Sequence, residues 1–503
     1  MSDSNPNTGD QITTVAMFIT TGLEIDSSAM VTISFPLDTL SLRSKDKKVL
    51  MRNLMKVSFA IIAVLVIVVG LPVVMLAQEA TRYDLLLKGG HVIDPANHID
   101  EVRDVGVLRG EIAAVEKNIP ADQARKVVDV SKLYVTPGLI DIHYHVGHGG
   151  APVNWFAPDA RAHALPLGIP ADLALQSGVT TIVDAGTSGA ETFLQEKEEV
   201  IDRARVRVLA FLNIVANGMN GGLEQSLDQM DVKLCVDTIK KYRDLIVGVK
   251  TAHYWTREPW DGEHVPWAAV DRALECGILT NSPVMFDFWP RPERTYEDLI
   301  LKKMRPGDIH THVFAQQFPI ILPDGKLNPA IAEARARGVI FDVGHGAGSF
   351  WFRNAVPAEK QGFIPDSIST DLHMGDYLTV SMNNVMSKFL AMGVPLEDVI
   401  RRSTVNPARE IHRPDLGTLS IGQDADIAVL ELTQGNFSYI DCGVAKMDGN
   451  VRLTTRMTIR AGRISYDPSG LSMVVWEKAR SQYFTIPNGD GALPARADDF
   501  PRD

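Results

Sequence analysis

Cysteine and clustered positive charge are both scarce in this chain of 503 residues. Its three cysteines, Cys235, Cys276 and Cys442, lie far apart and cannot all pair, which argues against a disulfide framework or a cysteine zinc site. Lysine and arginine total 50 against 62 aspartates and glutamates, a formal net charge of −12. Nucleic-acid binding needs clustered positive charge that displaces phosphate counterions, so this balance disfavours a nucleic-acid partner.

Long apolar runs are also rare, and one of them bears on location. Residues 57–77, VSFAIIAVLVIVVGLPVVMLA, carry no charge and are about as long as a helix that crosses the roughly 30 Å hydrocarbon layer. A basic stretch precedes this run, so the positive-inside rule predicts that the chain after it is exported. We expect an upstream extension or disordered segment at 1–50 and a signal peptide or membrane anchor at 51–80. The remainder would be periplasmic, extracellular or anchored outside the cytoplasm, with membrane contact only through 57–77.

The composition, 45% hydrophobic and 22% charged, is that of a folded globular protein with a large core. From residue 139 onward, strand-like runs alternate with helical stretches, which predicts parallel strands joined by crossovers. The runs are LIDIHYHV (139–146), TTIVDAG (180–186), RVLAFLNIV (207–215), LIVGVKTAHY (245–254), SPVMFDFW (282–289), DIHTHVF (308–314), VIFDVGHG (339–346) and DSISTDLH (366–373). Eight such strands close a (β/α)8 TIM barrel. An open doubly wound sheet is the alternative, but no glycine-rich phosphate fingerprint follows any run.

Shorter alternating segments flank this region on both sides. YDLLLKGGHVID and DVGVLRGEIAAVEKN precede it, and GTLSIGQDADIAVLEL and VRLTTRMTIRAGRISYD follow it. We therefore expect an α/β protein with a barrel at 137–412 and a small composite β-sandwich domain from both chain ends, 81–136 plus 413–470. Residues 471–503 lack periodicity and are expected to form a C-terminal tail.

Ionisable residues collect at the ends of the expected barrel strands. His143 and His145 are two apart on one strand, so both imidazoles face the same way, which is chelating geometry. Later strand ends supply Lys250, Asp287, His310, His312, His345, Asp371 and His373. Because the carboxyl ends of barrel strands converge on one pocket, this joint pattern predicts a metal-dependent hydrolase site.

These motifs resemble those of a known family. TPGLIDIHYHV, GVK, GDIHTHVF, ISTDLH, TVNPAR and GTLSIGQDADIAVLE together resemble the amidohydrolase superfamily, in its dihydroorotase-like and deacetylase-like metallohydrolase branch, over roughly residues 83–470. The resemblance implies a barrel with a composite β-sandwich and two divalent metal ions, usually zinc.

The resemblance also implies a ligand set. His143, His145 and Asp371 would hold the more buried ion, His312 would bind the second, and Lys250, converted to a carbamate by carbon dioxide, would bridge both. Where the family has a histidine on the fifth strand, this chain has Asp287. A carboxylate can ligate zinc, so we include Asp287 in the ligand set. A weak or absent second metal remains the alternative, with His310 as a possible compensating residue.

The expected chemistry follows from a hydroxide held between the ions. Metal binding lowers the pKa of water from 15.7 toward about 7, and Asp371 would accept the proton and pass it to the leaving nitrogen as general acid and base. His345, His373 and His310 are candidates for binding a small-molecule amide or ester substrate.

One further position helps to distinguish between the possible reactions. Dihydroorotase-type sites carry an arginine two residues beyond the histidine pair, where this chain has Gly147. An N-acyl or related amide hydrolase is therefore the first choice, and a cyclic amidase or an acetyl esterase is the alternative. A non-catalytic barrel scaffold is the alternative of another class, and a homo-oligomer is left open.

Overall fold

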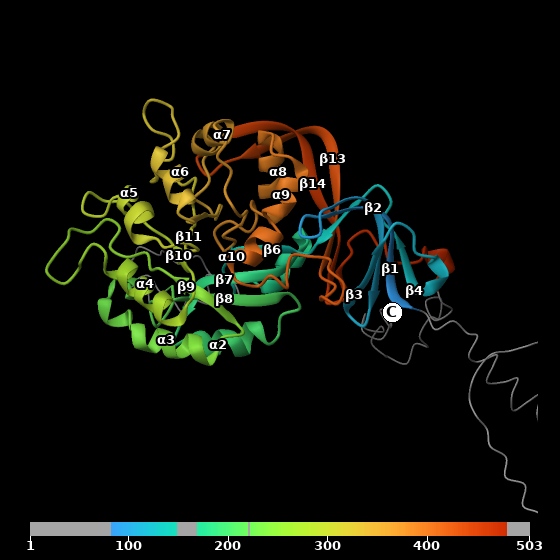
Figure 1. Cartoon of the computed structure of the whole chain (residues 1–503), viewed down its shortest axis with the longest axis horizontal. Coiled ribbons are helices and arrows are strands. Elements are labelled where there is room, and N and C mark those ends of the chain that lie inside the picture. Colours follow the sequence, from blue (N-terminus) through green and yellow to red (C-terminus); the bar gives the residue numbers. More distant parts are fainter. Residues whose placement is uncertain (1–81, 148–167, 220–221, 480–503) are drawn as a thin grey trace, which may run out of the picture. The chain divides into compact units, whose positions relative to one another are not determined.

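A parallel sheet forms the centre of the computed structural model, which describes residues 82–147, 168–219 and 222–479 (Figure 1). Seven strands pair in parallel in chain order, each with the next. They are β6 (Leu139–Tyr144), β7 (Val179–Gly189), β8 (Arg207–Asn213), β9 (Ile246–Lys250), β10 (Val284–Phe286), β11 (Ile309–His310) and β12 (Ile340–Phe341). Each lies within one of the first seven runs expected from the sequence or overlaps it.

The eighth expected strand is present as an extended segment without regular pairing. Residues 366–373 form a parallel bridge to each edge of the seven-stranded sheet, Asp342 with Ser367 and Tyr144 with Leu372. The amide of Asp371 donates to the carbonyl of His143 at 2.7 Å. Asp371 has φ +50°, which interrupts a regular strand. The curled sheet and this connecting segment fit a TIM barrel.

Helices follow most of the strands and pack apolar side chains against the sheet. The helices are α2 (Phe193–Glu196), α3 (Val232–Lys241), α4 (Ala268–Thr280), α5 (Tyr296–Asp298), α6 (Pro329–Ala336), α7 (Phe352–Lys360), α8 (Met382–Met392), α9 (Leu396–Arg401) and α10 (Val405–Glu410). Shorter helical turns are η1 (Ala121–Gln123), η2 (Ala171–Ser177), η3 (Lys197–Ile201), η4 (Leu223–Gln225), η5 (Leu227–Gln229), η6 (Leu299–Lys303) and η7 (Trp476–Lys478). The side chains of Asp231 and Ser381 cap α3 and α8 by accepting from backbone amides.

A second sheet combines strands from before and after the barrel. Its order is β15-β14-β13-β5-β1-β2-β3, with β4 paired to β1. The strands are β1 (Tyr83–Asp94), β2 (Ile99–Leu108), β3 (Glu111–Glu116), β4 (Ala124–Asp129), β5 (Tyr134–Pro137), β13 (Ile427–Ile440), β14 (Lys446–Arg460) and β15 (Arg463–Tyr466). Leu87, Val105, Ile427 and Met457 are buried in one core cluster of this sheet. Its arrangement as a β-sandwich, and the boundaries 81–136, 137–412 and 413–470, stay predictions.

The expected location of the protein requires a correction. Within residues 82–147, 168–219 and 222–479, no helix combines the length and the apolar character needed to cross a membrane. The run at 57–77, the segments 1–50 and 51–80, and the tail from residue 480 lie outside the described residues. The structure therefore does not support the signal peptide, the membrane anchor or the export that the sequence suggested, and we carry none of them forward.

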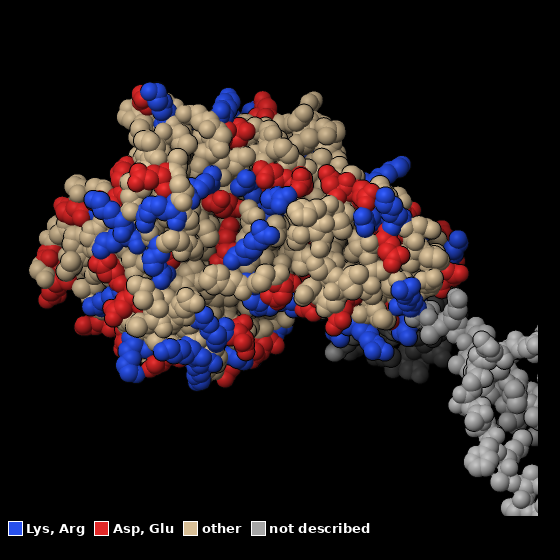
Figure 2. Space-filling model, viewed as in Figure 1, with Lys and Arg blue, Asp and Glu red and all other residues tan. Residues whose placement is uncertain are grey.

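Charged side chains of both signs are interspersed on the face of the described chain seen in Figure 2. Many form local pairs, such as Lys197 with Asp202 at 2.7 Å and Lys233 with Asp237 at 2.6 Å. Exposed pairs of this kind contribute only about 0–1 kcal/mol each. The charges that bear on function are therefore the buried ones at the strand ends of the parallel sheet.

Candidate metal centre

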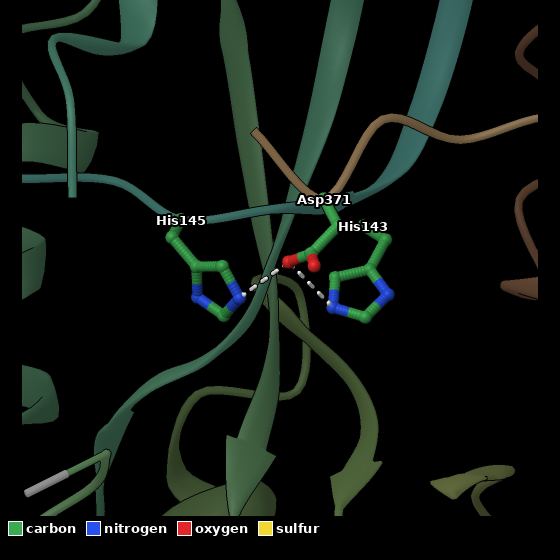
Figure 3. A group of neighbouring side chains, drawn as sticks. All are labelled: His143, His145 and Asp371. Atoms are coloured by element: carbon green, nitrogen blue, oxygen red, sulfur yellow. Dashed lines mark ion pairs between the residues drawn. The ribbon is translucent and has the colours of Figure 1, made fainter. Parts of the chain in front are cut away.

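The end of one strand, β6, and the connecting segment 366–373 bring His143, His145 and Asp371 together. The two histidines come from β6 and its end, and all three side chains are buried. Nε2 of His143 lies 3.2 Å, and Nε2 of His145 3.1 Å, from the same oxygen, Oδ1 of Asp371 (Figure 3). Within the part of the chain that the structure describes, this is the one group of three such side chains whose donor atoms all lie within 4.8 Å of one another.

The opposite side of each imidazole is anchored. Nδ1 of His143 lies 2.7 Å from Oγ1 of Thr311, whose hydroxyl donates to Asp342 at 2.8 Å. The Thr311 oxygen therefore accepts from His143, which places the proton on Nδ1 and leaves a lone pair on Nε2. Nδ1 of His145 lies 2.8 Å from Oγ1 of Thr187. Such contacts are typical of metal-binding histidines, because they fix the ring and its tautomer.

One buried atom tests whether a metal ion fits this group. Nε2 of His143 is buried and has no hydrogen-bond partner within the described part of the chain, although it lies 3.2 Å from a carboxylate oxygen. A deprotonated imidazole nitrogen facing a carboxylate is unfavourable unless a cation lies between them. Two imidazoles and a carboxylate are also a common donor set for zinc. The residues present fit a divalent ion.

Two glycines beside the site allow its side chains to approach. Gly344 and Gly346 have φ +45° and +50°, in the left-handed region. A Cβ on Gly344 would lie 2.8 Å from Nδ1 of His312 and nearer still to Thr311, and a Cβ on Gly346 would lie under 3.0 Å from Oδ2 of Asp371. The motif GHG is therefore required by geometry, which the sequence alone did not indicate.

A second cluster surrounds Asp287, directly after β10. Its Oδ2 lies 2.7 Å from Nε2 of His253, 3.2 Å from Nε2 of His312 and 3.5 Å from Nζ of Lys250. Nδ1 of His312 donates to the carbonyl of Gly344 at 2.7 Å. The structure thus brings together Lys250, Asp287 and His312, as the sequence predicted, and adds His253. This histidine follows the end of β9, where strand periodicity gives no information about direction.

The structure places His310 and His345 outside these clusters. The His310 ring packs edge-on against Phe318, with centroids 4.6 Å apart, and Nδ1 contacts the carbonyl of Thr311. In His345, Nδ1 lies 2.9 Å from the carbonyl of Gly346 and Nε2 lies 2.6 Å from Nζ of Lys388. Nε2 of His310 has no hydrogen-bond partner among the described residues, whereas both ring nitrogens of His345 have a polar neighbour. The substrate-binding roles of His310 and His345, and a compensating metal role for His310, stay predictions.

His373 differs from these two histidines. Its ring centroid lies 6.2 Å from that of His145, and its Nδ1 accepts from the backbone amide of Gly375 at 2.8 Å. In the neutral ring, Nε2 then carries the proton and can donate to a substrate. Burial lowers the pKa of His373, which favours this neutral form.

The electrostatics of the two clusters are similar. Burial by itself would raise the pKa of Asp371, but His143, His145 and His312 hold it well below its usual range. Burial would likewise raise the pKa of Asp287, yet His253, His312 and Lys250 hold it well below its usual range. Both carboxylates are therefore ionised at neutral pH and available to a cation.

Comparison with known proteins also points to a metal-dependent hydrolase. Residues 352–464 match the Amidohydrolase family. A deacetylase of Brucella anthropi is 29% identical over 378 residues, which cover 73% of this chain and 89% of the relative. A crystal structure of an adenine deaminase superposes with a TM-score of 0.66 at 25% identity, covering 76% of this chain and 100% of the other. A crystal structure of a dihydroorotase gives 0.63 at 25% identity, covering 76% and 98%.

The chain belongs to the amidohydrolase superfamily. It is a metal-dependent hydrolase of carbon–nitrogen bonds, and the alternative of a non-catalytic scaffold is set aside. The resemblance seen in the sequence is confirmed.

Proposed function

We propose that this protein hydrolyses N-acyl or related amides, as a deacetylase-type enzyme, with two divalent ions that are most often zinc in this superfamily. The observation that carries the proposal is the convergence of His143 and His145 on one oxygen of Asp371, where Nε2 of His143 has no hydrogen-bond partner among the described residues. The deacetylase relative, matched over 89% of its length, supports the choice of acyl amides.

The ligand set of the proposal divides between the two clusters. His143, His145 and Asp371 would hold the more buried ion, and His312 and Asp287 would hold the second. When bound, the ions polarise the substrate carbonyl and lower the pKa of water, which supplies a nucleophile at neutral pH.

Lys250 is proposed to bridge the two ions as a carbamate. Its side chain is 1% exposed, and among the described residues its Nζ has polar contacts only with the carbonyl of Ala185 at 3.4 Å and with Asp287 at 3.5 Å. These are long contacts for a buried ammonium group, which would also repel cations. Loss of a proton to solvent would give the free amine, and its nitrogen would then form a bond to the carbon of carbon dioxide and release a second proton. The product, a carbamate, would carry a negative charge in place of the positive one and offer two oxygen ligands.

The protein's own residues then move the proton. Asp371 is ionised and lies at the centre of the first cluster, so it accepts a proton from the attacking water and returns it to the leaving nitrogen. His373 donates from Nε2 to an oxygen of the bound substrate, since its Nδ1 is held by Gly375. Thr311 and Thr187 keep the His143 and His145 rings in place during the reaction.

A cyclic amidase remains the second candidate. The dihydroorotase structure shares the fold over 98% of its length, which favours this reaction. Against it, Gly147 stands where the clamp arginine for a substrate carboxylate is expected. An acetyl ester is a further alternative substrate for the same nucleophile.

A substrate screen tests the proposal. The full chain, reconstituted with zinc and bicarbonate, is assayed against N-acetyl amides, cyclic amides and acetyl esters. We expect the highest kcat/KM for an N-acyl amide, with the activity lost in Asp371→Asn. Turnover of cyclic amides alone would contradict the acyl assignment, and turnover that survives both chelation and Asp371→Asn would contradict the mechanism.

A further inference from the structure

We infer that His253 is a ligand of the second metal ion, so that this ion is held by His253, His312 and Asp287. The inference rests on the proposed function, because it assumes that a second ion binds beside Lys250. His253 was not in the expected ligand set. It would supply the imidazole ligand that is missing because Asp287 stands where the family has a histidine.

The distances around Asp287 support this assignment. Nε2 of His253 is 2.7 Å from Oδ2 of Asp287, nearer than Nε2 of His312 at 3.2 Å. Two imidazole nitrogens thus face one carboxylate oxygen, as His143 and His145 face Asp371. Each cluster therefore contains two histidines and one carboxylate, a donor set that binds divalent metals.

His253 is also anchored as a metal ligand is. Its Nδ1 lies 3.3 Å from Oε1 of Glu224, and Glu224 is buried. Because an ionised carboxylate only accepts hydrogen bonds, Nδ1 carries the proton and Nε2 is the donor atom for a metal. His312 has the same arrangement, with Nδ1 bonded to the carbonyl of Gly344.

The surroundings leave room for His253 to adjust. The donors of this cluster are spread more widely than those of the first, which alone among the described residues lie within 4.8 Å of one another. Ion binding must therefore draw His253 and His312 closer together. The His253 side chain is 37% exposed, and His253 and Asp287 both line one cavity, so this ring is not confined on every side by packed side chains.

The charge balance explains why an extra imidazole suits this site. An aspartate in place of a histidine removes a neutral nitrogen ligand and adds a negative charge. His253 restores the nitrogen ligand while Asp287 remains as an anionic one. The competing explanation is a structural ion pair between a protonated His253 and Asp287. In that case, removing His253 should change the metal content no more than removing another histidine that pairs with a carboxylate.

Metal stoichiometry of purified full-length variants distinguishes these explanations. We expect about two zinc ions per chain in the wild type and about one in His253→Ala. The matched control is His264→Ala, which removes another histidine that contacts a carboxylate in the same loop, Asp261 at 2.7 Å. This control should keep two ions.

Cobalt substitution gives a second readout that does not depend on activity. In Co(II)-loaded His253→Cys, a ligating thiolate should add a charge-transfer absorption band that is absent from the wild type and from His264→Cys. Two ions in a folded His253→Ala, or no new band in His253→Cys, would overturn the inference and leave the proposed function standing. A wild type that binds no metal would instead overturn the proposed function.

Discussion

Replacing Gly346 by alanine tests how closely the backbone must approach Asp371. Gly346 has φ +50°, a conformation that costs an L residue roughly 1–2 kcal/mol. A Cβ there would lie far inside the 3.4 Å at which ordinary contact with Oδ2 of Asp371 begins, so the carboxylate must move by about 1 Å. Catalytic groups tolerate about 0.5 Å of displacement, and about 1 Å can cost 10²-fold in rate.

We therefore expect Gly346→Ala to lose about 10- to 100-fold in kcat/KM, with weaker zinc binding and a melting temperature lower by a few degrees. The matched control is Gly348→Ala, because a Cβ on Gly348 meets nothing within 4 Å and its φ is not positive. The assays are kcat/KM, zinc titration and thermal unfolding on both variants. Equal kcat/KM and zinc affinity in the two variants would refute the reasoning.

Three further predictions concern the same centre. Asp371→Asn should keep the fold but lose about 10²–10⁴-fold in turnover, measured on metal-replete protein, and a loss under tenfold would contradict its proton-transfer role. Lys250→Ala should lose activity and regain part of it with a short added carboxylate; an unmodified Lys250 in the fully loaded wild type, seen by crystallography, would rule out the carbamate. Thr311→Val should weaken zinc binding about 10- to 100-fold by freeing the His143 ring, as measured by competition with a chelator, and unchanged affinity would show that Thr311 does not orient the ring.

The barrel was predictable because its signals are local. Apolar strand runs and their spacing identify β6 to β12, and the two-residue spacing of His143 and His145 is enough to place their side chains on one face of a strand. Lys250, Asp287 and His312 were found in the same way, as ionisable residues where parallel strands end. These positions depend on short-range pattern, which a single sequence contains.

Other features depend on contacts between distant parts of the chain. His253 meets Asp287 only because two loops after β9 and β10 approach each other, and Nε2 of His345 meets Lys388 only because α8 packs beside it. The packing of His310 against Phe318 was likewise not predicted. Such pairings have no signature in strand periodicity, since they are set by how loops and helices pack around the sheet.

Crystallography of the zinc-loaded protein, with anomalous scattering at the zinc edge, tests the central claim most directly. The account predicts two anomalous peaks, one bound by His143, His145 and Asp371 and the other by His312 and Asp287, with Lys250 between them. A fully loaded crystal with no peak at the His143, His145 and Asp371 group would contradict it.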